Sequence, residues 1–278
     1  MNVVDEFDKL ERYKLYRNLY EIIHPTISKK NISNYKIVLE EDLVPVRVFY
    51  PEKISCIDSF IIYIHGVGEI TGHSHSYSSI CRELAINTKK LVLAIDYRFG
   101  GEYKFPVPLD DCYKVVKYIY QNISNYGIDP KKIVIMGDSF GGNLVASLIL
   151  KSKYEKDFTV DKQVLISPIF DNNIDNVDFS DQYYIVNKLF NYYVSDLDDT
   201  NNSLIYPLRE NDYSNMPSTL IVVTEDDLYI DFSKEYFERL NNDNNKFVSM
   251  GLHGYKLLDS GVIEFKNKFY NVVNDFLD

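Results

Sequence analysis

Residues 133–143 read IVIMGDSFGGN, an apolar run followed by a glycine-rich turn. The segment GDSFG at 137–141 fits the pattern G-x-S-x-G, with Ser139 at its centre. IVIM predicts a buried strand, and GGNLVASLILKSK after it predicts a helix. A nucleophile elbow requires this strand–turn–helix context, because the flanking glycines let the backbone turn sharply and expose the serine hydroxyl. The alternative is an ordinary turn between strand and helix, with a serine that caps the helix.

Working outward, apolar runs and helical patterns alternate along the rest of the chain. Residues 35–50 are predicted to be extended. Further strands are predicted at 60–64, 91–97, 163–170, 218–226 and 246–254, and helices at 75–88, 109–123, 231–242 and 263–277. Strands that alternate with helices imply βαβ units, so the predicted fold class is α/β with a mostly parallel sheet and helices on both faces.

Two segments stand outside this alternation. Residues 4–23 repeat apolar positions at helical spacing, and Pro25 ends that predicted helix. Residues 171–212 are polar and carry the aromatic run YYIVNKLFNYY, which predicts an inserted helical segment followed by a loop. Because no Gly/Ser/Pro-rich linker divides the chain, we expect residues 1–278 to form a single domain.

Composition and charge exclude several classes of function. The chain has 278 residues, of which 45% are hydrophobic and 26% charged, as in ordinary globular proteins. Its net charge of −11 argues against nucleic-acid binding and against anionic membrane surfaces. The acidic N-terminus is unlike a secretory signal and no apolar run is long enough to span a bilayer, so a cytoplasmic protein without stable membrane insertion is expected.

No metal site is expected from the sequence. The three cysteines, Cys56, Cys81 and Cys112, lack CxxC spacing. His73 and His75 flank a serine in a polar loop and have no evident third ligand. The acidic run DLDD at 196–199 lacks the spacing of a calcium loop.

A serine nucleophile needs a base, and His253 is the best placed of the five histidines because it follows the predicted strand KFVSM. The base needs an acid to orient it, and Asp226 closes the predicted strand STLIVVTE. Asp227 and Glu225 remain alternatives, because one residue of register turns a side chain around. The chain order Ser139, Asp226, His253 is the order expected for an α/β-hydrolase.

The oxyanion formed during acyl transfer needs backbone N–H donors. One is expected from Phe140, the residue after the nucleophile. The others are expected from Gly66, Val67 and Gly68, in the turn that follows the strand FIIYI. An ordinary turn at the end of a strand is the alternative for these residues.

Together these motifs resemble the hormone-sensitive-lipase-like branch of the α/β-hydrolases, which includes acetyl esterases and carboxylesterases. The resemblance covers nearly the whole chain. HGVG at 65–68 is similar to the family's HGGG, GDSFGGN at 137–143 to GDSAGGN, DYR at 96–98 to DYR, DDL at 226–228 to DPL and HGY at 253–255 to HGF.

The resemblance implies an eight-stranded sheet and a small cap built from about residues 1–30 and 171–212. It implies a small-molecule ester as substrate, hydrolysis of short-chain acyl esters without a cofactor, and a monomer or homodimer. Val67 and Phe140 are bulkier than the family's residues, so we expect a narrow acyl site. An amide, lactone or acetyl-sugar hydrolase of the same fold, or a non-enzymatic receptor-like binder, is the alternative.

Overall fold

The structure is a computed structural model of the chain. It describes residues 32–39, 42–51, 59–66, 77–100, 102–126, 129, 132–172, 190–195, 200–251 and 263–278. The helix predicted at 4–23, His73, His75, the DLDD run and much of the predicted insertion lie outside the described residues.

The described strands form one eight-stranded sheet in the order β1-β2-β4-β3-β5-β6-β7-β8. β2 pairs antiparallel with both β1 and β4, and all other neighbours are parallel. The predicted fold class is therefore confirmed. The strands are β1 Ile32–Leu39, β2 Asp42–Phe49, β3 Phe60–Ile64, β4 Leu91–Ile95, β5 Ile133–Asp138, β6 Lys162–Ile166, β7 Ser218–Thr224 and β8 Lys246–Met250.

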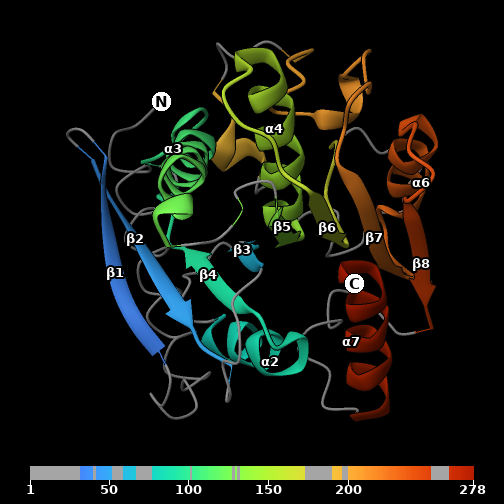
Figure 1. Cartoon of the computed structure of the whole chain (residues 1–278). Helices are drawn as coiled ribbons and strands as arrows, with labels where there is room; N and C mark the ends of the chain where they lie inside the picture. Colours follow the sequence, from blue (N-terminus) through green and yellow to red (C-terminus); the bar gives the residue numbers. More distant parts are fainter. Residues whose placement is uncertain are drawn as a thin grey trace, which may run out of the picture.

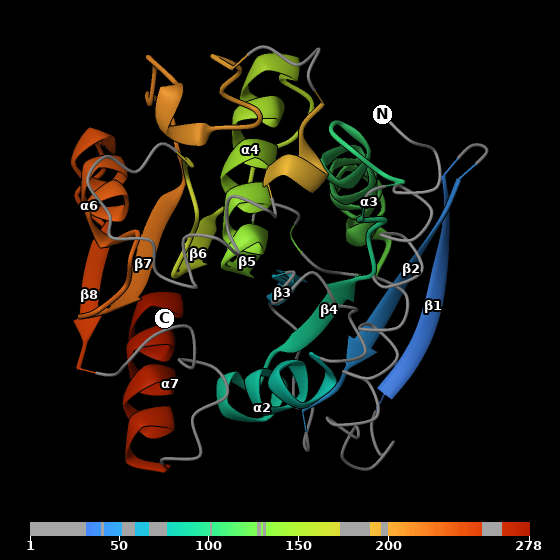
Figure 2. The same ribbon diagram turned by 180° about the vertical axis from the view of Figure 1, so that it is seen from behind.

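Helices cover both faces of this sheet (Figure 1). α3, α4 and α6 lie on one face and α2 and α7 on the other, and the view from behind shows the same two layers (Figure 2). The helices are α2 Ser78–Thr88, α3 Val107–Asn122, α4 Phe140–Glu155, α6 Ile230–Arg239 and α7 Ile263–Leu277, with short 3-10 helices η2 Ile123–Tyr126 and η4 Pro207–Arg209.

Alternating side chains of the central strands supply two separate cores. In β3, Ile62 and Ile64 belong to the core under α3 and α4, whereas Ile61 and Tyr63 belong to the core under α2 and α7. β5 alternates in the same way. Both faces of these strands are buried, which explains why their sequences are continuous apolar runs.

α4 is apolar on all sides because it is enclosed on all sides. Nearly every residue of its first three turns is buried. Segments between β6 and β7 lie over α4 on the side away from the sheet (Figures 1 and 2), and Tyr193 and Ile205 from these segments share its core. The helix that begins in the glycine-rich turn is therefore enclosed between the sheet and these segments.

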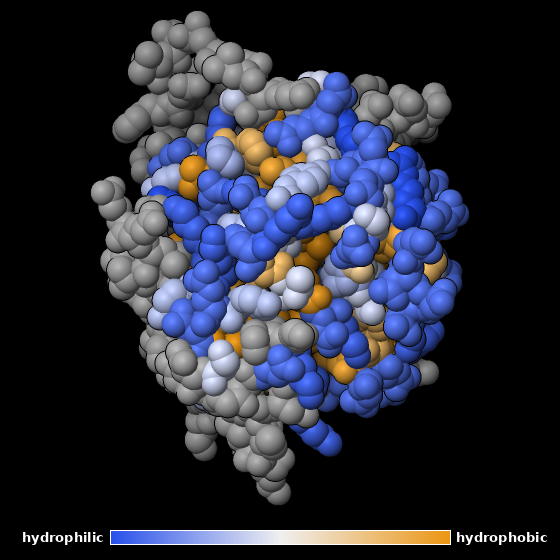
Figure 3. Space-filling model, turned by 45° about the horizontal axis from the view of Figure 1, so that its top comes forward, coloured by the Kyte–Doolittle hydropathy of each residue, from blue (hydrophilic) through white to orange (hydrophobic). Residues whose placement is uncertain are grey.

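The described part of the surface drawn in Figure 3 is mostly hydrophilic. Figure 3 shows polar side chains over most of the described part of this face, with apolar side chains visible between them. Among the described residues, no helix combines the length and the apolar character needed to cross a bilayer.

Candidate active site

Ser139 sits at a sharp turn between the end of β5 and the start of α4. Its φ of 52° and ψ of −121° place a non-glycine residue in the left-handed region, and its side chain makes no capping bond to the first turn of α4. A serine that caps a helix has extended backbone angles and an engaged oxygen. The side chain of Ser139 therefore does not cap the helix, and the backbone of this half-buried residue fits the geometry expected of a nucleophile elbow.

The glycines on either side of Ser139 permit this turn by close approach. A Cβ on Gly141 would overlap the carbonyl oxygen of Ile64 in β3, and a Cβ on Gly137 would lie 2.5 Å from the carbonyl oxygen of Gly141. The start of α4 is thus pressed directly against the sheet. Only glycine fits at both positions of the G-x-S-x-G pattern.

Backbone hydrogen bonds hold the turn to the neighbouring strand. The N–H of Ser139 donates to the carbonyl of Ile166 at 2.8 Å, and the N–H of Ile169 donates to the carbonyl of Ser139 at 3.3 Å. The buried amide of Asn143 donates to the carbonyls of Ile169 and Ile205 at 2.8 and 3.0 Å. Asn143 therefore ties α4 both to the loop after β6 and to the later part of the predicted insertion.

The ring of Phe140 points into the core. It is fully buried and meets the ring of Tyr193 at 4.7 Å and that of Phe99 at 5.2 Å, between ring centroids. A fully buried ring offers no surface to an acyl chain, so the position of Phe140 does not support the expectation that its ring narrows an acyl site. Its N–H belongs to the first turn of α4, where backbone donors lack intrahelical partners.

The stem of the predicted oxyanion turn lies beside Ser139. A Cβ on Gly66 would lie 3.1 Å from the Cβ of Ser139. His65 stacks between the rings of Tyr77 and Tyr97 at 5.2 and 4.6 Å, and its Nδ1–H donates to the carbonyl of Gly66 at 2.7 Å. The hydroxyl of Tyr97 donates to the carbonyl of His65 at 2.7 Å.

The N–H of Gly66 has a partner of its own. It donates to Oδ1 of Asp138 at 2.9 Å. This amide is thus directed at a carboxylate, and the predicted donors of Val67 and Gly68 lie outside the described residues. The sequence analysis assigned no role to Asp138, and it did not predict this contact.

Asp138 is a buried carboxylate with three donors. The hydroxyl of Tyr63 donates to Oδ1 at 2.6 Å and that of Tyr77 to Oδ2 at 3.2 Å, in addition to the Gly66 amide. Burial raises the pKa of Asp138 to about 6, although its three donors oppose that rise. The stability that its protonated form contributes is present below the unfolded pKa near 4 and is lost as the pH rises through about 6.

The three candidate acids that directly follow β7 in the chain differ in their surroundings. Asp226 and Glu225 are exposed, and a Cβ on Gly251 would lie 3.5 Å from Oε1 of Glu225. Asp227 is partly buried, its Oδ1 accepts the N–H of Tyr229 at 2.9 Å, and burial raises its pKa. His253 lies outside the described residues.

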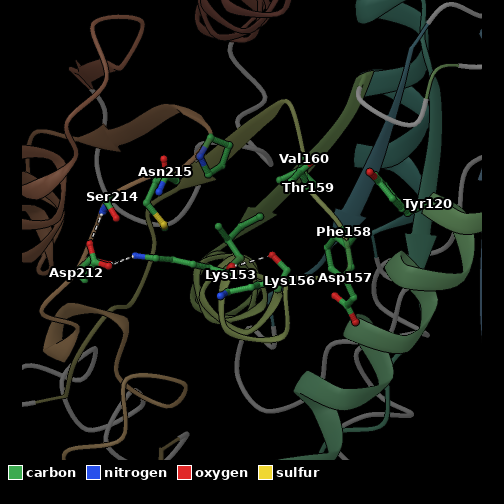
Figure 4. A pocket seen from close by; sticks show the side chains of 14 residues that line it. Tyr120, Lys153, Lys156, Asp157, Phe158, Thr159, Val160, Asp212, Ser214 and Asn215 are labelled. Atoms are coloured by element: carbon green, nitrogen blue, oxygen red, sulfur yellow. Dashed lines mark hydrogen bonds and ion pairs between the residues drawn. The ribbon is translucent and has the colours of Figure 1, made fainter.

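A cavity of about 610 Å³ lies far from this turn. Its lining includes Lys153, Lys156 and Asp212, near the C-terminal end of α4. α4 has 16 residues, so this end is about 20 Å from Ser139. Figure 4 shows Lys153 directed at Asp212, with which it forms an ion pair of 2.8 Å. The cavity is separate from the candidate active site.

Comparison with known proteins agrees with this geometry. The sequence profile of the alpha/beta hydrolase fold family matches residues 61–255, which include the oxyanion turn, the serine turn and the candidate acids and base. The chain belongs to the α/β-hydrolase fold family. The resemblance to its hormone-sensitive-lipase-like branch is confirmed by relatives named arylesterase, arylacetamide deacetylase and carboxylesterase.

Relatives match this α/β-hydrolase over different lengths. An arylesterase of Saccharolobus solfataricus is 28% identical over 264 residues, which is 91% of this chain and 85% of that protein. A carboxylesterase of Mycobacterium tuberculosis is 31% identical over 37% of this chain and 32% of that protein. A solved arylesterase structure superposes with a TM-score of 0.80 at 26% identity, covering 97% of this chain and 93% of the other.

Proposed function

We propose that this α/β-hydrolase is a serine carboxylesterase that cleaves short-chain acyl esters through an acyl-enzyme. The single observation that carries the proposal is the backbone of Ser139, held at a φ of 52° on a strand-to-helix turn with its side chain free of any capping role. The esterases and carboxylesterases among the relatives support a carboxylic ester hydrolase.

In the proposed mechanism, Ser139 attacks the ester carbonyl while His253 takes its proton. Asp226 orients His253 and stabilises its charged form. The amides of Phe140, Val67 and Gly68 hold the oxyanion, and the amide of Gly66 fixes the stem of their turn. His253 then protonates the leaving alcohol. In the second half of the reaction His253 takes a proton from water, which attacks the acyl-enzyme and releases the acid and free Ser139.

The proposed preference for short acyl chains rests on Val67, and Phe140 contributes only to the core behind the serine turn. Phe140 fills the core space next to Ser139, where the family has a small residue, and Tyr193 from the predicted insertion packs on it. Val67 adds a branched side chain to the oxyanion turn. We propose that residues 1–30 and 171–212 form the cap over this site.

We expect the wild-type protein to hydrolyse p-nitrophenyl acetate and butyrate faster than p-nitrophenyl octanoate, because the branched side chain of Val67 in the proposed oxyanion turn limits the length of the acyl chain. The measurement is kcat/KM for the three esters, with acetanilide and a lactone alongside them. Turnover that rises toward octanoate would contradict the narrow site. Hydrolysis of the amide or the lactone alone would favour the alternative hydrolases, and a folded protein that cleaves none would favour the receptor-like binder.

Replacing the three candidate acids one at a time identifies the partner of His253. We expect Asp226→Asn to lower kcat by about 10⁴-fold, because the histidine then loses the carboxylate that fixes its tautomer. Asp227→Asn keeps an oxygen for the Tyr229 amide, and Glu225→Gln keeps its size. Each is expected to lose less than about tenfold in kcat on p-nitrophenyl acetate. A larger loss in either of these two variants would transfer the role to that residue.

A further inference from the structure

We propose that Asp138 is a positioning residue that seats the oxyanion turn against the nucleophile turn. This inference rests on the proposed function, because it concerns the same reaction at Ser139. Asp138 immediately precedes the nucleophile but projects to the opposite face of the sheet from Phe140, toward α2. Its carboxylate joins β5 to the segment that follows β3.

Two tyrosine hydroxyls hold the carboxylate in addition to its contact with the oxyanion turn. Tyr63 comes from β3 and donates to Oδ1 at 2.6 Å, and Tyr77 comes from the residue before α2 and donates to Oδ2 at 3.2 Å. Asp138 is 9% exposed and Tyr63 is fully buried. Charge-assisted hydrogen bonds in such a setting are short and directional, so the carboxylate has a fixed position.

The same Oδ1 atom accepts the Gly66 N–H at 2.9 Å. Gly66 is also in close contact with this carboxylate through its Cα, because a Cβ there would lie 2.7 Å from Oδ2 of Asp138. Gly66 immediately precedes Val67 and Gly68, whose amides are the proposed oxyanion donors. Asp138 therefore fixes the position, relative to Ser139, of the residue that immediately precedes those donors.

An oxyanion donor acts only when it lies at hydrogen-bond distance from the charge that develops in the transition state. Displacing the stem of the turn weakens binding of the transition state more than binding of the ground-state ester. A loss of positioning at Asp138 should consequently lower kcat and leave KM nearly unchanged.

The test compares Asp138→Ala with Asp138→Asn in the full-length protein, using p-nitrophenyl acetate. We expect Asp138→Ala to lower kcat by about 100-fold, as the loss of one oxyanion donor does, with KM within about twofold of wild type. Asn retains an oxygen that can accept the Gly66 N–H, so Asp138→Asn should stay within about tenfold of the wild-type kcat. Should the alanine variant fail to fold, Asp138→Glu takes its place, since it keeps the charge but moves the acceptor.

Asp157→Ala is the matched control. Asp157 also accepts a tyrosine hydroxyl at 2.6 Å, from Tyr113, and pairs with Lys117 at 2.7 Å, but it lies beyond the far end of α4. Its loss should lower the melting temperature and leave kcat within about twofold. An Asp138→Ala variant with wild-type kcat, or with the same kinetic change as Asp157→Ala, would overturn the positioning role. A wild-type protein without esterase activity would instead overturn the proposed function.

Discussion

Ser139→Ala should abolish ester hydrolysis while leaving the fold intact. Removing the nucleophile of a serine hydrolase costs about 10⁶-fold in kcat, or about 8 kcal/mol of transition-state stabilisation. The hydroxyl makes no capping bond to α4, so its loss should leave the free energy of unfolding unchanged within about 0.5 kcal/mol. The measurement is kcat on p-nitrophenyl acetate beside urea unfolding followed by circular dichroism.

A fluorophosphonate supplies an independent readout of the same residue. It should label the wild-type protein stoichiometrically, with the adduct on the peptide that contains Ser139, and it should not label Ser139→Ala. Ser214, which is exposed and lies near the far end of α4, serves as an internal control for non-specific labelling. Labelling that survives in Ser139→Ala, together with residual hydrolysis, would place the nucleophile elsewhere.

Gly141→Ala should be the most destabilising single-methyl substitution near the site. The added Cβ would overlap the carbonyl oxygen of Ile64, a backbone atom in the central strand β3. Neither α4 nor β3 can move without disturbing a buried core, so we expect the free energy of unfolding to fall by at least about 3 kcal/mol. The higher helix propensity of alanine offsets only about 1 kcal/mol of this loss in the free energy of unfolding. Urea unfolding measures the difference, and esterase activity should fall with it.

Gly142→Ala is the comparison for this substitution. It adds the same methyl group one residue along the same helix, where the Cβ would lie 2.9 Å from the Cβ of Pro168. Pro168 lies in a loop after β6, so the neighbour can shift more readily than a central strand. We expect a smaller loss of stability at Gly142, and equal losses would argue against close approach to β3 as the cause.

Much of the fold was predictable because the sheet is buried on both faces. FIIYI, LVLAI and IVIM are continuous apolar runs, and such runs between helical patterns predict parallel strands. The serine turn was predictable for a different reason, since its two glycines stand where the backbone touches β3. The position of the candidate acids was predictable as well. They follow a strand parallel to the one that precedes Ser139, so they lie at the same edge of the sheet as the serine turn.

What sequence reasoning missed are contacts between residues far apart in the chain. Tyr63 reads as one more core residue of FIIYI, and nothing local shows that its hydroxyl meets Asp138, 75 residues later. Asp227 reads as one of three acidic residues after a strand, and nothing local shows that its Oδ1 accepts the N–H of Tyr229 just before α6. Such pairings depend on the register of strands and turns, which periodicity does not specify.

The left-handed backbone conformation of Ser139 serves the proposed catalysis at the expense of folding stability. A non-glycine residue held in such a conformation costs about 1–3 kcal/mol, and the surrounding contacts with β3 and β6 must supply that free energy. Stability alone would therefore favour glycine at this position, and the presence of serine supports the proposed role of this residue in catalysis. Thermostable variants of this protein should accordingly be sought in its two cores and its surface rather than at the turn.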